Sequence, residues 1–150
     1  MLPKNCFLAA IDLGSNSFRL EIDHYSKGKV FRKDYLREPI RLGVGLDEQN
    51  ALTRDAMERG WVCLQMFKEH LDEMNIHRIR AVATQTLRVA TNRDAFIKRG
   101  RKILGCPIEV ISGKEEALLI YTGVTAILDR KEKEPNDRKS AIYSINCQEN

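Results

Sequence analysis

The sequence predicts an α/β fold, with a mixed five-stranded sheet and helices packed on its faces. Two observations support this fold class. Residues 6–36 contain three strand-like segments, and the turns between them are short enough to require antiparallel pairing. Residues 53–128 then alternate between helical spacing of apolar residues and short apolar runs, which is typical of helices that connect the strands of a sheet.

The first three strands follow from apolar alternation and from turn residues. The apolar run 6–11 is typical of a buried strand. Within residues 17–25, one face holds Phe18, Leu20, Ile22 and His24, and the other holds Arg19, Glu21 and Asp23. A Ser-Lys-Gly-Lys turn precedes a third, less regular strand over residues 30–36. A loop is expected from residue 37 to residue 50, because Pro39 stops regular structure.

The next segments predict a helix, a strand and a second helix. Thr53 is a good N-cap for a helix that continues to about Asn75. Its stripe of Met and aromatic residues is far more typical of a core than of a cofactor site. A strand over 79–83 and a turn over 84–86 follow. The second helix is capped by Asn92 or Thr91 and ends at Gly105.

The last part of the chain predicts one more strand and one more helix before a charged segment. Residues 107–111 form the strand, and Ser112 opens a helix that runs to about residue 128. Residues 129–139 are charged and contain a proline, so we expect a solvated loop there. A final strand is expected over residues 141–145.

Composition limits the class of protein. A chain of 150 residues with 43% hydrophobic and 31% charged residues is typical of one soluble globular domain. We expect no transmembrane segment and no secretory signal, because no apolar run approaches the thickness of a bilayer and the N-terminus lacks a long apolar segment with a cleavage site. The 4 cysteines are scattered and show no zinc-site spacing, so we expect buried thiols and a cytoplasmic location. The net charge of +4 suits an anionic ligand but is too weak to indicate nucleic acid. The basic run over 98–102 is typical of a solvated helical face rather than a polyanion track.

A tight polar turn after the first strand is the most informative feature of the chain. Glycine allows a sharp turn and a close approach of a ligand, and consecutive amides in such a turn can face an anion. A carboxylate at the strand end suits Mg²⁺ that accompanies phosphate. The residues concerned are Asp12, Gly14, Ser15, Asn16 and Ser17. The alternative is an ordinary β-hairpin turn, in which the same residue types are common.

Two further segments supply candidates for chemistry on a phosphate. Glu115 and Glu116 lie in the first turn of a helix, where acidic residues also stabilise the helix dipole. Glu116 could instead orient and deprotonate a water molecule. Arg88 follows a strand and could contact phosphate oxygens, although a surface arginine is the simpler interpretation. Thr84 and Thr86 are expected to cap a helix rather than to contact a ligand.

Four segments in order resemble the exopolyphosphatase/guanosine pentaphosphate phosphohydrolase family. The first is Ala-Ala-Ile-Asp-Leu-Gly-Ser-Asn-Ser-Phe at residues 9–18. The second comprises Gly-Leu, Leu-Thr, Ala-Met and Arg-Gly pairs within residues 45–60, and the third is Thr-Gln-Thr-Leu-Arg at 84–88. The fourth joins Ile-Ser-Gly-Lys-Glu-Glu-Ala at 111–117 to Tyr-Thr-Gly-Val at 121–124. One such turn is weak evidence, but four in order are specific.

The resemblance implies a fold, an activity and a role for each candidate residue. The family belongs to the superfamily of sugar kinases, actin and the heat-shock chaperone ATPases, so it implies a ribonuclease H-like (actin-like ATPase) lobe. Its members use Mg²⁺ to remove terminal phosphate from inorganic polyphosphate, or the 5′ γ-phosphate from guanosine pentaphosphate. Asp12 would help to place the metal, Arg88 would contact the chain or the leaving group, and Glu116 would be the catalytic base. The phosphate would be held by Gly14, Ser15, Asn16 and Ser17.

The chain departs from the family pattern near its end. There the family carries an acidic residue followed by a Gly-Gly-Gly-Ser loop, whereas this sequence has Tyr143 and then Asn146 and Cys147. The resemblance therefore covers a first lobe over residues 1–128, with 129–150 as a charged linker and the truncated start of a missing second lobe.

Three functions are compatible with these observations. The first is an exopolyphosphatase-like hydrolase. The second is an inactive phosphate- or polyphosphate-binding or regulatory module, acting as a homodimer or paired with a full-length relative. The third is a nucleotide-binding lobe of the chaperone or kinase type, which the family-like segment at residues 112–117 disfavours.

Overall fold

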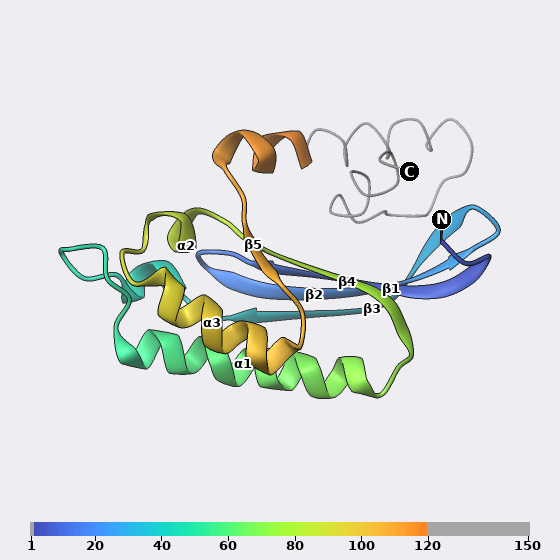
Figure 1. The fold of residues 1–150 in the computed structure, drawn as a ribbon, viewed down its shortest axis with the longest axis horizontal. Helices are drawn as coiled ribbons and strands as arrows, with labels where there is room; N and C mark the ends of the chain where they lie inside the picture. Colours follow the sequence, from blue (N-terminus) through green and yellow to red (C-terminus); the bar gives the residue numbers. More distant parts are fainter. Residues whose placement is uncertain (1, 120–150) are drawn as a thin grey trace.

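The computed structural model describes residues 2–119 of the chain (Figure 1). Its sheet has five strands in the order β3-β2-β1-β4-β5. These are β1 (Asn5–Leu13), β2 (Ser17–Ser26), β3 (Lys29–Pro39), β4 (Ile76–Ala83) and β5 (Ile108–Val110). The β1–β2 and β2–β3 pairs are antiparallel, and the β1–β4 and β4–β5 pairs are parallel. The mixed five-stranded sheet of a ribonuclease H-like lobe is therefore confirmed.

Turn chemistry explains the antiparallel half of the sheet. Lys27 and Gly28 connect β2 to β3, and both have positive φ, at 51° and 74°. Two consecutive residues with positive φ give a turn whose twist matches that of the flanking strands. The predicted turn at this position is thus confirmed, and it fixes the register that pairs Ser26 with Lys29.

Helices cover both faces of the sheet. The elements outside the strands are η1 (Leu42–Gly45), α1 (Arg54–Asp72), α2 (Gln85–Val89) and α3 (Arg93–Leu104). Helices α1 and α3 lie side by side under one face, and the helical residues 113–119 lie over the other (Figure 1). The side chain of Thr53 accepts a hydrogen bond from the amide of Ala56 at 3.2 Å, which confirms the predicted N-cap.

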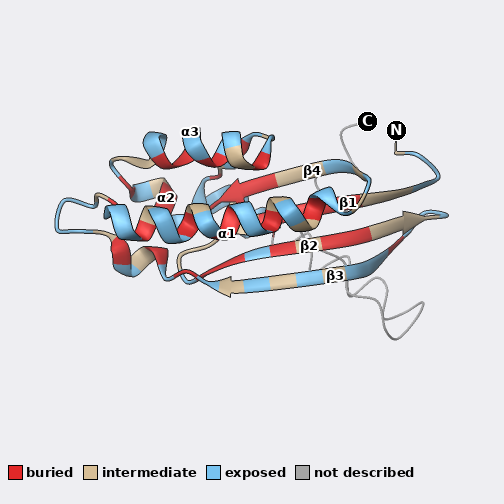
Figure 2. Cartoon of the chain, turned by 90° about the horizontal axis from the view of Figure 1, so that it is seen from below, coloured by how far each residue is buried: buried red, intermediate tan, exposed pale blue. Residues whose placement is uncertain are grey.

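The main core fills the space between the sheet and the α1–α3 pair. Figure 2 shows buried residues along β1, β2 and β4, whereas β3 is an edge strand with mostly exposed residues. The indole of Trp61 stacks on Phe96 with ring centroids 5.8 Å apart, and its Nε1 donates to the Phe96 carbonyl at 3.2 Å. The apolar stripe of α1 is therefore core, as predicted.

Several element boundaries differ from the sequence-based prediction. Strand β3 continues to Pro39, which pairs with Ser17, because an edge strand tolerates a residue that lacks an amide hydrogen. Strand β4 begins at Ile76, where pairing with Phe7 of β1 starts, rather than at residue 79. Helix α1 ends at Asp72 instead of near residue 75.

The predicted turn at 84–86 is also wrong, because residues Gln85–Val89 form helix α2. The prediction that Asn92 or Thr91 caps α3 is right about the position of the helix start but wrong about the bond. Asn92 occupies the N-cap but makes no capping bond; its carboxamide pairs with the backbone of Leu52, at 2.8 Å and 3.0 Å. This pairing attaches the start of α3 to the segment before α1.

The helix predicted to open at Ser112 is present as far as the structure describes it. The Oγ atom of Ser112 accepts a hydrogen bond from the amide of Glu115 at 3.1 Å. The rest of this helix, the charged loop at 129–139, the strand at 141–145 and the lobe boundary after residue 128 lie outside the described residues. Within residues 2–119, each helix is too short or too polar to cross a membrane.

Candidate functional site

The turn between β1 and β2 is tight, and its geometry requires a glycine. The amide of Gly14 donates to the carbonyl of Ser17 at 3.1 Å. A Cβ atom on Gly14 would lie 2.9 Å from that same oxygen, closer than side chains approach backbone atoms. The turn is therefore a compact hairpin connection, and its residues can also present polar groups at the end of the sheet.

The segment that follows β3 holds this turn from one side. The carbonyl of Asn16 accepts from the amides of Ile40 and Arg41, at 3.0 Å and 2.9 Å. The carbonyl of Ser15 accepts from the amide of Gly43 at 2.9 Å. These bonds use the carbonyl oxygens of Ser15 and Asn16 and hold the turn against the segment that follows β3. Arg41 adopts a left-handed conformation with φ of 52°, which is rare for arginine.

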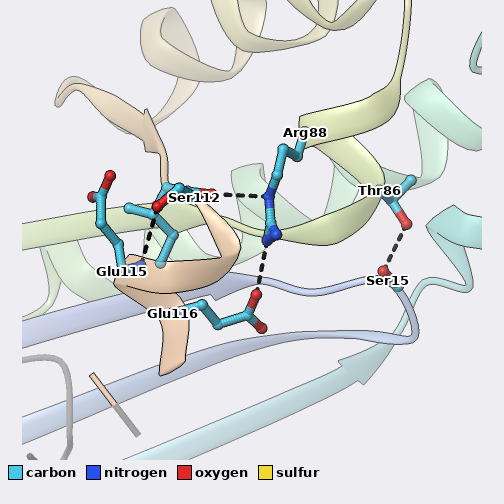
Figure 3. Close-up of polar contacts among 7 residues, drawn as sticks. Ser15, Thr86, Arg88, Ser112, Glu115 and Glu116 are labelled. Atoms are coloured by element: carbon cyan, nitrogen blue, oxygen red, sulfur yellow. Dashed lines mark hydrogen bonds and ion pairs between the residues drawn. The ribbon is translucent and has the colours of Figure 1, made fainter. Parts of the chain in front are cut away.

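Both serine hydroxyls of the turn have partners elsewhere in the chain. Thr86 Oγ1 donates to Ser15 Oγ at 2.7 Å, and Arg37 Nε donates to Ser17 Oγ at 3.2 Å. Thr84 occupies the N-cap of α2, as predicted, but its side chain makes no capping bond. The capping prediction is wrong for Thr86, whose side chain reaches back to the β1–β2 turn (Figure 3).

Arg88 is held on two sides by the junction that follows β5. Its Nε donates to the carbonyl of Ile111 at 3.0 Å, and its Nη2 donates to Oε2 of Glu116 at 2.7 Å. A Cβ atom on Gly113 would lie 3.1 Å from Arg88 Nη1, so only glycine leaves the guanidinium ample room there. The interpretation of Arg88 as an ordinary surface arginine does not fit this arrangement.

The two neighbouring glutamates have different environments. Glu115 is exposed, and its amide completes the cap made by Ser112. Glu116 is half-buried and turns toward Arg88, on a different side of the helix from Glu115 (Figure 3). Stabilisation of the helix dipole accounts for Glu115, whereas Glu116 has a specific partner that brings it to the end of the sheet.

The carboxyl of Asp12 lies on the same side of the sheet as Glu116. Burial raises the pKa of Asp12, the positive charge of Arg19 opposes this rise, and the negative charge of Glu116 adds to it. The two carboxyl groups are thus close enough to interact electrostatically. They come from the end of β1 and from the helix after β5, which lie far apart in the sequence.

Asp12 fits a role in holding Mg²⁺. Among the described residues, its buried Oδ1 has no hydrogen-bond partner, which is the condition of an oxygen available to a cation. Residues 2–119 contain no group of three or more acidic, histidine or cysteine side chains that could hold a metal ion. Mg²⁺ usually binds through one or two carboxylates plus substrate phosphates, so a single carboxylate beside the β1–β2 turn would suit it.

The structure brings all the predicted site residues to one end of the sheet. Asp12 and the β1–β2 turn lie at the carboxyl end of β1, while Arg88 and Glu116 lie beyond the carboxyl ends of β4 and β5. Their roles in binding and catalysis remain predictions. Sequence reasoning missed the contacts of Thr86 and Arg37, because each joins segments that only the sheet order makes adjacent.

Known proteins resemble this chain in sequence and in structure. A model of the Ppx/GppA phosphatase family matches residues 30–135 of the chain. The guanosine-5′-triphosphate,3′-diphosphate pyrophosphatase of Vibrio vulnificus is 52% identical over 116 residues, which are 77% of this chain and 23% of that protein.

Two solved structures resemble the lobe closely. The PPX-GPPA enzyme of Aquifex aeolicus superposes with a TM-score of 0.78 at 32% identity, over 83% of this chain and 42% of that one. An exopolyphosphatase from Cytophaga hutchinsonii superposes with a TM-score of 0.77 at 30% identity, over 80% of this chain and 38% of that one. The chain therefore spans less than half the length of these relatives. On the family match and on this similarity in structure, it belongs to the Ppx/GppA phosphatase family.

Proposed function

We propose that this chain is the phosphate-binding and water-activating lobe of an exopolyphosphatase-type phosphoanhydride hydrolase. The observation that supports the proposal best is the convergence of Asp12, Arg88 and Glu116 beside the β1–β2 turn. Phosphoryl transfer needs a positioned phosphate, neutralisation of charge and an oriented nucleophile, and these three side chains with the turn match those needs.

In this proposal the turn binds the terminal phosphoryl group of the substrate. Gly14 allows a close approach, and donors from Ser15 and Asn16 contact phosphate oxygens. Glu116 contacts Arg88 through Oε2, which leaves Oε1 to accept a proton from a water molecule. The water oxygen bonds to the terminal phosphorus as the bridging P–O bond breaks, and the bonding electrons stay with the leaving phosphate.

Arg88 has two roles in the same proposal. In the structure its guanidinium pairs with Glu116, which orients the carboxylate. A bound polyanion attracts the same guanidinium, and a bidentate contact to phosphate oxygens stabilises the charge that develops on the leaving group. The fixed contact of Nε with the Ile111 carbonyl keeps the group at the site during this exchange.

Mg²⁺ would be held by Asp12 together with phosphate oxygens. When bound, the ion neutralises phosphate charge and polarises the P–O bonds. The net charge of +4 on the chain also suits a polyanionic substrate. Inorganic polyphosphate and guanosine pentaphosphate are the two substrate classes, and the relative that is 52% identical carries a name that favours the guanosine nucleotide.

A phosphate-release assay tests the proposal. The chain is incubated with polyphosphate or guanosine pentaphosphate and Mg²⁺, beside a Glu116→Gln variant that keeps the size of the side chain. Release by the unmodified chain and a loss of at least about 100-fold in the variant are expected, since general-base catalysis contributes 10² or more. Equal rates would exclude Glu116 as the base.

A second candidate is a binding or regulatory module without turnover. It is supported by the contact between Arg88 Nη2 and Glu116 Oε2 at 2.7 Å, because an ion pair engages the carboxylate that a hydrolase would need as its base. Such a module would act as a homodimer or together with a full-length relative. Titration with polyphosphate in a calorimeter distinguishes the two candidates, because saturable binding without phosphate release supports the module and excludes the hydrolase.

A further inference from the structure

We propose that Thr86 is a positioning residue that orients the hydroxyl of Ser15 toward the ligand and couples the β1–β2 turn to Arg88. This inference rests on the proposed function and adds a residue to it. The contact that carries it is the hydrogen bond from Thr86 Oγ1 to Ser15 Oγ at 2.7 Å, between residues 71 positions apart (Figure 3).

This bond joins two hydroxyl groups, and either of them can donate its proton. A serine hydroxyl has one proton to donate and lone pairs to accept with. A phosphate oxygen requires a donor, so a bound phosphate favours the arrangement in which Ser15 gives its proton to the ligand and accepts the proton of Thr86. Thr86 is buried, with 4% of its surface exposed, whereas Ser15 is only half-buried. The bond therefore holds the Ser15 hydroxyl from the buried side, and the solvent-facing side of the hydroxyl is left for the ligand.

A third segment encloses the bond. The amide of Gly43 in η1 donates to the carbonyl of Ser15 at 2.9 Å. A Cβ atom on Gly43 would lie 3.2 Å from Thr86 Oγ1 and 3.5 Å from Ser15 Cβ, so the backbone of η1 packs directly against both side chains. Ser15 is thus fixed by its carbonyl on one side and by its hydroxyl on the other.

Helix α2 transmits the position of Ser15 to the arginine. Thr86 and Arg88 lie two residues apart on a five-residue helix whose ends are fixed by backbone bonds. The amide of Arg88 donates to the Thr84 carbonyl at 3.0 Å, and that of Ala90 donates to the Thr86 carbonyl at 2.9 Å. Thr86 therefore sets the distance between the phosphate-binding turn and the Arg88–Glu116 pair.

A double-mutant cycle on the full chain tests the proposal. The variants are Thr86→Val, which removes only the hydroxyl, Ser15→Ala and the double variant, and Thr86→Ser is the control that keeps the hydroxyl. The readout is the affinity for tripolyphosphate with Mg²⁺, measured by calorimetry. Loss of one hydrogen bond predicts about 2- to 10-fold weaker binding for T86V and less than about 2-fold for T86S.

The cycle separates positioning from a merely structural role. If Thr86 acts through Ser15, T86V causes no further loss in the S15A background. Equal losses in both backgrounds overturn the proposal, as does T86S binding as weakly as T86V. The thermal midpoint of each variant is recorded, so that a general loss of folding is recognised.

A second measurement needs no ligand and keeps the outcome separate from that of the proposed function. In a ¹⁵N NMR spectrum, T86V should shift both the Gly43 amide and the Arg88 Nε resonances, whereas T86S should leave them near their original positions. If tripolyphosphate does not bind but these shifts occur, the proposed phosphate binding fails while the coupling remains. Unchanged resonances in T86V overturn the coupling itself.

Discussion

Asp12 combines a cost in stability with a place in the proposed site. It lies at the end of a buried strand, and burial raises the pKa of its carboxyl. Nearby Glu116 adds to the rise because it is also acidic, and exposed Arg19 compensates only in part. A buried carboxylate with an unpartnered oxygen among the described residues is costly, and a bound cation would relieve that cost.

Replacing this carboxyl should stabilise the protein and weaken its binding of Mg²⁺. Because the pKa of Asp12 is raised in the folded state, its protonated form contributes its full stabilisation below the unfolded-state pKa of about 3.9. This contribution to the free energy of unfolding is lost as the pH rises through the folded-state pKa. Asp12→Asn should therefore unfold at a higher temperature than the unmodified chain at pH 7 and at the same temperature at pH 3. Urea or thermal unfolding at both pH values checks this, and a less stable variant at pH 7 would contradict it.

Asp23 gives a second prediction at the residue scale. It is completely buried on β2, and its burial together with the negative charge of Glu21 raises its pKa to about 8. Its folded pKa is raised, so the free energy of unfolding should fall as the pH rises from about 4 to about 8, with a slope of up to about 1.4 kcal/mol per pH unit, and then level off. Denaturant unfolding of Asp23→Asn should lack this slope, and an identical slope in the variant would exclude Asp23 as its source.

At the scale of elements, the packing of α3 against α1 and β5 depends on glycines. A Cβ atom on Gly60 would lie 2.7 Å and 2.9 Å from the ring of Phe96, which is itself packed against Trp61 and Phe18. A Cβ atom on Gly100 would meet the Cδ1 atom of Ile108 at 2.8 Å, and an aliphatic terminus adjusts more easily than a stacked ring.

The difference between these two glycines is measurable. Alanine should gain about 0.8–1 kcal/mol of helix propensity at either position. Overpacking costs about 1–3 kcal/mol. We expect Gly60→Ala at the upper end of that range, because the stacked ring of Phe96 cannot easily move away from the added methyl group. We expect Gly60→Ala to reduce the free energy of unfolding, measured in urea, by more than Gly100→Ala. The opposite order would show that the aromatic cluster adjusts more easily than the aliphatic contact.

The elements that sequence reasoning predicted well are those with strong local signals. The turn at Lys27 and Gly28 and the N-cap at Thr53 depend on residues adjacent in sequence, and both are confirmed. Helix α2 was missed because five residues carry too little periodicity to distinguish a helix from a turn. Asn92 did not cap its own helix because the backbone of Leu52, 40 residues away, competes for its carboxamide.

For the whole molecule, the order of the strands determines where the site lies. The parallel pairing of β1 with β4 and of β4 with β5 puts the carboxyl ends of three strands together. Asp12 lies at the end of β1, and the segments after β4 and β5 carry Arg88 and Glu116. Ligands in open α/β sheets bind outside the carboxyl ends of strands, so this placement agrees with the general rule.

Ligand binding at this end of the sheet should stabilise the entire lobe. At a concentration of 100 times its Kd, a ligand that binds only the folded state raises the free energy of unfolding by about 2.7 kcal/mol. This corresponds to a rise of roughly 5–10 °C in the thermal midpoint. Tripolyphosphate with Mg²⁺ should produce this shift in the unmodified chain and in Glu116→Gln, but not in Asp12→Asn. The shift is measured by calorimetric melting, and an equal shift in Asp12→Asn would show that Asp12 does not hold the ion.

The sequence alone determined the fold class, the polar turn after β1 and the residue types available for phosphate chemistry, because hydrophobic periodicity and turn preferences are local properties. Only the tertiary structure decided which of those residues meet. Segments distant in sequence are joined by the Thr86–Ser15 bond and by the Arg88–Glu116 pair, and Asp12 and Glu116 influence each other through their charges. Such contacts follow from strand order and from the packing of η1 and α2 against the β1–β2 turn, and no local pattern encodes them.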